Sequence, residues 1–368
     1  MPKGLLTELK SKLESSGDGG PVRTIAVCAT QIPFFKGGAE AHVNGLMREL
    51  AKRGYEVDLI NIPFKWYPRE QLLKSLEVWQ WLDLNESNAR KIDMIITTKF
   101  PSYFAEHPNK VLWLFHQFRH LYDLWGTPYS DFDSSQAADR RLRDQLIELD
   151  TEVLKSYKRI YTNAKNTAAR LKKYNGIDST PLYHPPHFAG RYFAAEDKGY
   201  ILSVGRLDRL KRVDLLVKSI PFMDRRIKCR IAGIGPELEY LQKLARSGGV
   251  ADRVEFMGFV PDDDLLALYA HATAVYFAPW DEDYGYVTLE AFLSQKPVVT
   301  ASDSGGPLEF VEDGKNGIVI QSTSEKELAQ KTEQLFFDKD RCRSYGRAGY
   351  DRVKDISWDS VIEILIHG

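Results

Sequence analysis

The sequence has little cysteine, no long apolar run and no surplus of charge of either sign. Its three cysteines, Cys28, Cys229 and Cys342, lie far apart and match no metal-ligand spacing, so we expect buried thiols in a reducing compartment. No run of about 18 apolar residues is present, and the N-terminus lacks the apolar core of a signal peptide. We therefore expect a cytoplasmic protein, and peripheral contact with the inner membrane face stays open.

The near-neutral charge excludes a further class of protein. A nucleic-acid-binding surface needs a basic surplus, whereas 50 Lys and Arg against 51 Asp and Glu give a formal net charge of −1. The residues that are present, 43% hydrophobic and 27% charged, are typical of a globular protein. The length of 368 residues is about twice that of a usual domain, so we expect two domains.

Strand and helix patterns alternate along the chain, and the alternation starts twice. After a polar leader that ends at Pro21, strands are expected at residues 23–29, 56–60, 92–97, 111–115 and 160–162, and helices at 39–53 and 137–157. The pair Pro185-Pro186 then interrupts the pattern because proline is excluded from helix interiors. Further strands are expected at residues 200–204, 227–232, 253–256, 274–277, 297–300 and 317–320, and helices near 340–350 and 358–366 end the chain.

This alternation predicts an α/β protein of two doubly wound, Rossmann-like domains. Ligands of open parallel sheets bind beyond the carboxyl ends of the strands. Two such edges that face each other form a cleft, so we expect the ligand site there.

An acidic turn follows the expected strand at residues 274–277 and reads W-D-E-D-Y-G-Y-V-T-L-E over residues 280–290. Gly285 lies at the turn, where a missing side chain lets the backbone approach a ligand. A helix is expected to begin near the next residue. The first backbone amides of that helix would then be available to hold a diphosphate; they belong to Tyr286, Val287 and Thr288.

The two glutamates of this turn, Glu282 and Glu290, are expected at the strand end and about one turn into the helix. A glycosidase pair is one alternative, but their sequential separation fits poorly with the carboxylate spacing of about 5–9.5 Å in such enzymes. The other alternative is an acidic first turn that the helix dipole stabilises.

A basic segment, G-R-L-D-R-L-K-R over residues 205–212, comes directly after the strand at 200–204. Arg206 and Lys211 are cations placed where phosphate oxygens can meet them, although a solvated basic helix start is common. At the first strand–helix junction, Gly37 and Gly38 permit close backbone approach to a sugar or phosphate, or simply mark a loop.

His116 follows the apolar strand at residues 111–115 and could donate to a sugar hydroxyl or a phosphate oxygen, or be structural. His120, His184 and His187 are less well placed. The segment that begins at Gly233 resembles a dinucleotide fingerprint but has Leu238 at its third glycine, which counts against a nicotinamide or flavin enzyme. No metal-ligand cluster is apparent, so no metal and no cofactor are expected.

Together these segments resemble the family 4 glycosyltransferases, which are retaining enzymes of the GT-B fold. The resemblance is strongest from residue 200 to residue 320, and in the N-terminal half only K-G-G-A-E and His116 share it. The stretches that carry it are ILSVGRLDRLKRVDLL, IAGIGPELEYL, VEFMGFVPDDDLLALYAHA, the acidic turn and KPVVTASDSGGPLEFVEDGKNGIVI. It implies an acceptor domain at residues 1–187, a nucleotide-sugar donor domain at 188–351 and a C-terminal helix, about 352–368, that packs back onto the first domain.

The resemblance also implies roles for individual residues. Arg206 and Lys211 would bind the donor diphosphate, and Glu282 would hold the hydroxyls of the donor sugar. Glu290 would hold the ribose hydroxyls, and His116 would reach the transferred sugar, so that Glu282, His116, Arg206 and Lys211 form the expected catalytic set. The other expected donor-binding residues are Gly37, Gly38, Gly233, Val260, Tyr284, Gly285, Tyr286 and Val287.

The implied activity is transfer of a hexose from a UDP- or GDP-sugar to an acceptor hydroxyl, in polysaccharide or glycoconjugate synthesis, without a metal. Trp280 and Asp283-Tyr284 depart from the Ser and Gly-Phe of many relatives, which puts the sugar pocket in question. A nucleotide-sugar epimerase of the same fold and a non-catalytic sugar-nucleotide-binding module are the alternatives.

Residues 64–81 interleave aromatic and basic side chains. They would suit a carbohydrate or lipid-linked acceptor, or lipid headgroups. An amphipathic helix that covers the sheet is the alternative.

Overall fold

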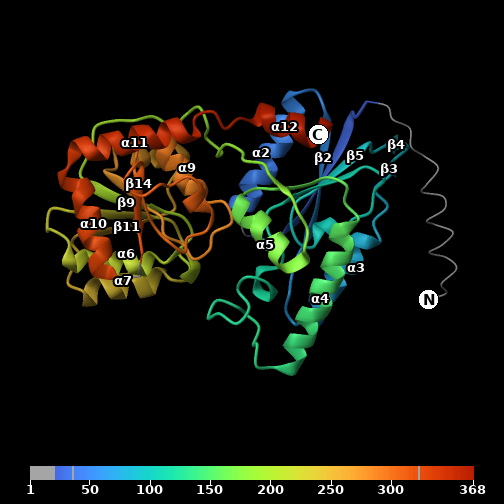
Figure 1. Cartoon of the computed structure of the whole chain (residues 1–368), viewed down its shortest axis with the longest axis horizontal. Helices are drawn as coiled ribbons and strands as arrows, with labels where there is room; N and C mark the ends of the chain where they lie inside the picture. The colour runs from blue at the N-terminus through green and yellow to red at the C-terminus, as the bar shows by residue number, and fades with distance from the viewer. Residues whose placement is uncertain (1–20, 35–36, 322–323) are drawn as a thin grey trace. The chain divides into compact units, whose positions relative to one another are not determined.

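The computed structural model describes residues 21–34, 37–321 and 324–368, which form two compact units (Figure 1). The first unit takes the chain up to residue 162, residues 168–182 and residues 358–368; the second takes residues 163–167 and 183–357. The predicted polar leader before Pro21 lies outside the described residues. Within the described ranges, no helix is both long enough and apolar enough to cross a membrane.

The first unit is built on a parallel sheet with the strand order β2-β1-β5-β6-β7-β8. Its strands are β1 (Thr24–Gln31), β2 (Glu56–Pro63), β5 (Met94–Thr97), β6 (Lys110–Leu114), β7 (Ile160–Thr162) and β8 (Thr180–Pro181), and a separate hairpin pairs β3 (Glu86–Ser87) with β4 (Arg90–Lys91). The central strand β5 is buried along its whole length, as expected for a parallel sheet covered on both faces.

Helices cover both faces of this sheet. The cores on the two faces take their side chains from α3 (Glu70–Gln80), α4 (Ala137–Lys155) and α5 (Lys165–Asn175) on one side, and from α2 (Gly38–Lys52) and α12 (Trp358–His367) on the other. Figure 1 shows α12 beside α2, although they lie at opposite ends of the chain. In α3, Leu72, Leu76 and Trp79 are buried against the sheet, which confirms the amphipathic-helix interpretation for residues 70–80.

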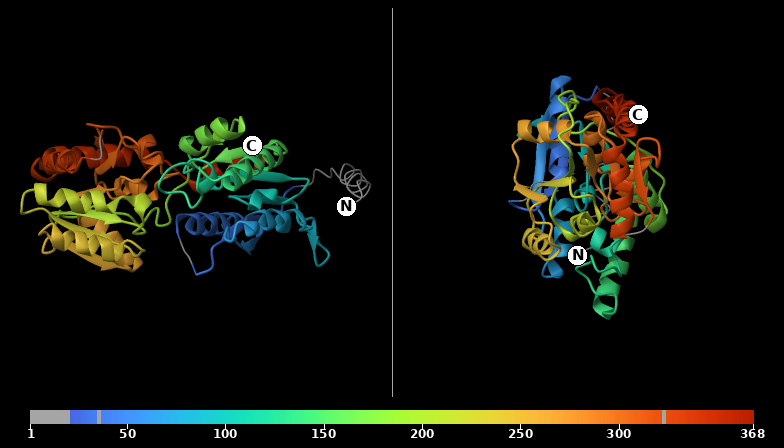
Figure 2. Two further views of the ribbon diagram at one scale, coloured as in Figure 1. Left: turned by 90° about the horizontal axis from the view of Figure 1, so that it is seen from below. Right: turned by 90° about the vertical axis from the view of Figure 1, so that its left-hand side faces the viewer.

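The second unit has a parallel sheet of order β11-β10-β9-β12-β13-β14. Its strands are β9 (Tyr200–Val204), β10 (Lys228–Ala232), β11 (Val254–Gly258), β12 (Ala274–Tyr276), β13 (Val298–Ala301) and β14 (Gly317–Ile320). One face carries α6 (Val213–Ser219), α7 (Leu238–Ser247) and α10 (Glu325–Phe337); the other carries α8 (Asp262–His271), α9 (Tyr286–Leu293) and the end of α11 (Lys339–Val353). Figure 2 shows the helices of this unit on both sides of its strands.

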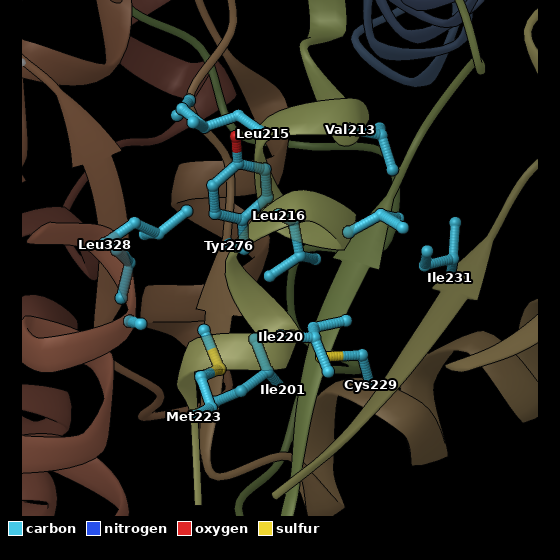
Figure 3. Close-up of a cluster of buried hydrophobic side chains, with 14 of the residues drawn as sticks. Ile201, Val213, Leu215, Leu216, Ile220, Met223, Cys229, Ile231, Tyr276 and Leu328 are labelled. Carbon is cyan, nitrogen blue, oxygen red and sulfur yellow. The ribbon is translucent and has the colours of Figure 1, made fainter. Parts of the chain in front are cut away.

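The core of the first of these faces packs aliphatic side chains from strands and helices together (Figure 3). Ile201 of β9 and Ile231 of β10 share this cluster with Leu216 of α6 and Leu328 of α10. Tyr276 of β12 is buried within the same cluster. This core fixes the strands whose carboxyl ends carry the loops described below.

The strand order of the second unit places a topological switch point between β9 and β12. From β9 the chain moves outward through β10 to β11, and then returns to β12 on the other side of β9. The loops that leave β9 and β12 therefore diverge at their carboxyl ends, where open α/β sheets bind ligands.

The division of the chain differs from the expected bounds of 1–187 and 188–351. Residues 183–187 fall in the second unit because the Tyr183 hydroxyl donates to Glu309 at 2.6 Å and the His184 amide donates to the Tyr284 hydroxyl at 3.1 Å. Residues 352–357 also belong to the second unit, so the segment within the first unit begins only at Trp358.

Candidate functional site

The loop after β9 and the acidic turn after β12 meet at the switch point of the second unit. The Trp280 amide donates to the Leu210 carbonyl at 2.7 Å, and the Nζ atom of Lys211 lies 2.5 Å from an Oε atom of Glu282. The two charged side chains are mostly buried, with exposed fractions of 24% for Lys211 and 19% for Glu282. The cation and the carboxylate predicted from separate segments thus form one ion pair.

Glycines let the backbone directly after β9 and β10 pack against the ends of the neighbouring strands. The Gly205 amide donates to Ala232 at 3.0 Å, and the Gly233 amide donates to Gly258 at 2.8 Å. Gly233 has a φ of +150°, and a Cβ atom there would lie 1.8 Å from the Gly205 carbonyl oxygen. No other residue fits at position 233 without moving this backbone, which lies at the edge predicted to bind the donor.

The helix α9 begins at Tyr286, as predicted, after Gly285 in a left-handed conformation with a φ of +83°. Within the described part of the chain, the amides of Tyr286 and Val287 make no hydrogen bond. The prediction for Thr288 was wrong, because its amide donates to the Gly285 carbonyl at 2.9 Å and closes a turn. Two amides rather than three are therefore available to an anion at this helix terminus.

His184 contacts both tyrosines of the turn, Tyr284 and Tyr286. The Tyr284 hydroxyl donates to the His184 carbonyl at 2.6 Å, and the His184 ring stacks on that tyrosine with centroids 4.6 Å apart. The Nε2 atom of His184 is hydrogen-bonded to the Tyr286 hydroxyl. Burial lowers the pKa of His184 to about 3, so the ring is neutral. His184, which sequence reasoning ranked below His116, thus holds the turn in place.

Glu290 has partners different from those of Glu282. Its carboxylate accepts a hydrogen bond from the buried Tyr269 hydroxyl at 2.5 Å, and burial raises its pKa. Glu282 instead pairs with Lys211. The two carboxylates therefore occupy different electrostatic environments. They do not resemble the paired carboxylates of a glycosidase, which flank a single glycosidic bond.

Arg206 and Val260 complete the predicted positions of the second unit. The Arg206 side chain is 46% exposed and its Nε atom lies 3.8 Å from Asp208. Val260 is half-buried, lies two residues after β11 and packs against the core that includes α8. The guanidinium is thus accessible at the strand-end loop, as a phosphate ligand must be.

The remaining predicted residues lie in the first unit. Gly37 is the N-cap of α2, and its amide donates to the Glu40 side chain at 2.8 Å, with Gly38 next in the helix. His116 follows β6 and is half-buried, with Nδ1 2.6 Å from the Gln117 carbonyl oxygen. These positions stand at the carboxyl ends of β1 and β6, where sequence reasoning placed them.

Two residues that sequence reasoning missed fasten the acidic turn. The Asn166 side chain donates to Asp281 at 2.7 Å and to the Glu282 carbonyl at 2.9 Å. Glu309 accepts the amides of Lys165 at 3.0 Å and Asn166 at 2.7 Å. The sequence does contain a signal for Asn166, because the residue lies just after the predicted strand at 160–162, where a ligand site is expected. Its partner Asp281, however, lies more than a hundred residues away.

Metal ligands do not gather in the described residues: no group of three or more His, Cys, Asp or Glu side chains could hold an ion there. All three cysteines are buried, as expected. For Cys28 and Cys229 burial raises the pKa of the thiol, which makes them unreactive.

Known proteins are similar to this chain in sequence. Residues 189–352 match the glycosyl transferases group 1 family. A D-inositol 3-phosphate glycosyltransferase of Corynebacterium aurimucosum is 26% identical over 88% of this chain and 88% of that protein. A GDP-mannose-dependent alpha-(1-6)-phosphatidylinositol monomannoside mannosyltransferase of Mycobacterium tuberculosis is 36% identical over 44% of each chain.

Solved structures share the fold along nearly the whole chain. Sucrose-phosphate synthase from Thermosynechococcus elongatus has a TM-score of 0.74 at 18% identity, and the match covers 92% of this chain and 96% of that one. WaaG, a glycosyltransferase of lipopolysaccharide biosynthesis, has a TM-score of 0.69 at 17% identity, with 94% and 100% covered. These neighbours confirm the predicted pair of Rossmann-like domains of the GT-B type. The family match and these relatives are all to glycosyltransferases, one of which is named as GDP-mannose-dependent.

Proposed function

We propose that this protein is a retaining hexosyltransferase that moves a sugar from UDP or GDP to an acceptor hydroxyl. The observation that carries the proposal is the Lys211–Glu282 pair at the switch point of the second unit. A lysine and a carboxylate side by side suit the two ends of a sugar diphosphate, because phosphate needs a cation and sugar hydroxyls need an acceptor.

In the proposed complex, the charge that develops on the leaving diphosphate is stabilised by preorganised donors. These are Lys211, Arg206 and the amides of Tyr286 and Val287 at the start of α9. Such fixed electrostatic groups are commonly the largest contribution to catalysis. The cations supply the positive charge that a metal ion supplies at other diphosphate sites, so we expect turnover to survive chelation with EDTA.

Binding of the donor requires that Glu282 exchange its partner. Lys211 turns toward the diphosphate, and the freed carboxylate accepts hydrogen bonds from the sugar hydroxyls. Glu290, oriented by Tyr269, takes the ribose hydroxyls. Roles for Gly38 against the diphosphate and His116 at the transferred sugar rest on the family resemblance and remain predictions.

The proposed stereochemistry is that of the retaining enzymes that the sequence resembles, and no residue of the proposed catalytic set is assigned as a general base. We propose that the leaving phosphate oxygen accepts the proton of the acceptor hydroxyl on the same face of the sugar. The bond from the anomeric carbon to phosphate breaks, the bond to the acceptor oxygen forms on that face, and the anomeric configuration is kept. NMR of the product distinguishes this outcome from inversion.

The relatives narrow the substrates to be tried first. One relative is named for D-inositol 3-phosphate and another for GDP-mannose with a phosphatidylinositol mannoside. A structural neighbour was solved with UDP and glucose. We therefore propose a cyclic polyol, or its lipid conjugate, as the first acceptor class to test with both donor bases.

A thermal-shift panel of UDP, GDP and their hexose conjugates tests the proposal, since a ligand of the native state raises the melting temperature. We expect one base to raise it, and sugar release that requires an acceptor. Conversion of the donor without acceptor would indicate an epimerase. Binding without release to any acceptor would indicate a non-catalytic module, and no shift with any nucleotide would contradict the proposal.

A further inference from the structure

Arg212, the residue after Lys211, has an unusual backbone and an unusual burial. Its φ is +48°, in the left-handed region that favours glycine, and only 7% of the residue is exposed. A strained, buried arginine persists only where its surroundings hold it, and such positions concentrate at functional sites. The proposed function assigns it no role.

The guanidinium of Arg212 makes four hydrogen bonds to the loops after β12 and β13. Its Nε atom donates to the Ala278 carbonyl at 2.8 Å, and Nη2 donates to the Pro279 carbonyl at 2.9 Å. Both terminal nitrogens bind the Asp303 carboxylate, at 2.8 and 2.6 Å. A planar fork that serves two carbonyls and one carboxylate at once is a geometry that lysine cannot reproduce.

These side-chain contacts of Arg212, here called the Arg212 clamp, are extended into the acidic turn by backbone hydrogen bonds. The Asp281 amide donates to the Asp303 carbonyl at 2.9 Å, and the Glu282 amide donates to the Ser304 carbonyl at 2.9 Å. On the other side, the Tyr276 hydroxyl donates to the Arg212 carbonyl at 2.8 Å. Arg212 therefore ties the loop that carries Lys211 to the turn that carries Glu282.

We propose that Arg212 is a positioning residue that sets the distance between Lys211 and Glu282, and thereby sets the rate of sugar transfer. The inference rests on the proposed function, since it assigns the Lys211–Glu282 pair to the donor. A buried arginine that served packing alone would not need to join these two loops. From this left-handed backbone the Arg212 side chain reaches the Ala278 and Pro279 carbonyls, while Lys211 contacts Glu282.

The test replaces Arg212 by glycine, which adopts the left-handed backbone freely and leaves space for a free guanidinium ion. We expect Arg212→Gly to lower kcat at least 30-fold while the donor KM changes less than 3-fold, because the cations remain but their geometry relaxes. Guanidinium chloride at about 50 mM should raise the kcat of this variant at least 5-fold. The same concentration of NaCl or urea should not raise it. Arg212→Lys should not recover activity.

A second measurement keeps the inference testable without turnover. Reductive ¹³C-methylation of the lysines gives an NMR signal for Lys211, identified by its loss in Lys211→Arg. Removal of its partner in Glu282→Gln should shift this signal, and Arg212→Gly should move it in the same direction. An unmoved signal, or kcat within 3-fold of wild type, overturns the role of Arg212. Absence of turnover in the wild-type protein overturns the proposed function instead, and the lysine signal then decides on the Arg212 clamp alone.

Discussion

At the scale of single residues, the ion pair between Lys211 and Glu282 concentrates the proposed chemistry in two side chains. Both side chains are mostly shielded from water, so their mutual attraction is stronger than that of an exposed ion pair. In the proposed complex, the diphosphate and the sugar replace the contact that each partner makes to the other.

Glu282→Gln should therefore lower kcat by about 100-fold, a loss typical of removing one group from an electrostatic catalytic site. Glutamine keeps the shape but loses the charge that holds Lys211 and accepts sugar hydroxyls strongly. Steady-state kinetics with the identified donor measures the change, and Glu255→Gln, at an exposed ion pair with Arg230, is the matched control. Turnover within a few-fold of wild type would show that Glu282 does not hold the sugar.

At the scale of an element, α4 carries a buried acid that makes the first unit sensitive to pH. Asp150 is fully buried, accepts a hydrogen bond from the Tyr122 hydroxyl at 2.6 Å, and burial raises its pKa to about 7. An unfolded chain has an ordinary carboxyl pKa of about 3.9. The native state therefore binds the extra proton between these values, and stability falls as the pH rises through that window.

Asp150→Asn removes this titration while its oxygen still accepts from Tyr122. We expect the stability of the variant relative to wild type to rise from pH 4.5 to pH 7.5, by about 1.4 kcal/mol per pKa unit crossed, and to level off above pH 7. Thermal melts of both proteins across this range measure it. Asp144→Asn, an exposed position of the same helix, is the control. A difference that is constant with pH would contradict a raised pKa at Asp150.

The sequence predicts the strands and helices more completely than it predicts the contacts between them. The strands Ile160–Thr162, Tyr200–Val204 and Gly317–Ile320 have the predicted bounds, because short apolar runs next to turn residues mark buried strands well. The start of α9 at Tyr286 was also predicted correctly, because Gly285 marks the turn before it. The pairing of Lys211 with Glu282 was not predictable, because it joins positions 71 residues apart through a strand order that the pattern does not reveal.

The same limit explains the residues that were missed. Arg212 was read as one more cation of a basic segment, because nothing in the sequence signals its left-handed backbone or its carbonyl partners. Asn166 and Glu309 were missed for a related reason, because their partners lie far away in the sequence. The prediction of a free Thr288 amide was wrong because the sequence does not show that the Gly285 carbonyl accepts this amide and closes a turn.

At the scale of the whole molecule, the last helix belongs to the unit that the chain left long before. Val361, Ile362 and Leu365 of α12 are buried in the core that also holds Leu46 of α2. The Arg159 side chain donates to the Ile366 carbonyl at 3.2 Å near the end of the helix. The core of the first unit therefore includes α12.

Leu365→Ala should destabilise the first unit by about 2–5 kcal/mol, the usual cost of truncating a fully buried leucine. Hydrogen exchange of the β1 and β6 amides reports that unit, and exchange in β9 and β12 reports the other. Glu363→Ala, on the exposed side of the same helix, should leave both unchanged. Equal protection of β1 in Leu365→Ala and wild type would mean that α12 contributes little to this core.

The central claim, that the second unit binds a nucleotide diphosphate at the Lys211–Glu282 pair, is tested most directly by calorimetric titration of UDP and GDP. The proteins to compare are wild type, Lys211→Ala and Lys218→Ala, whose lysine pairs with Asp214 on α6. We expect one nucleotide to bind wild type and Lys218→Ala with the same Kd and Lys211→Ala at least 10-fold more weakly. Equal binding by all three proteins, or no binding of either nucleotide, would contradict the account.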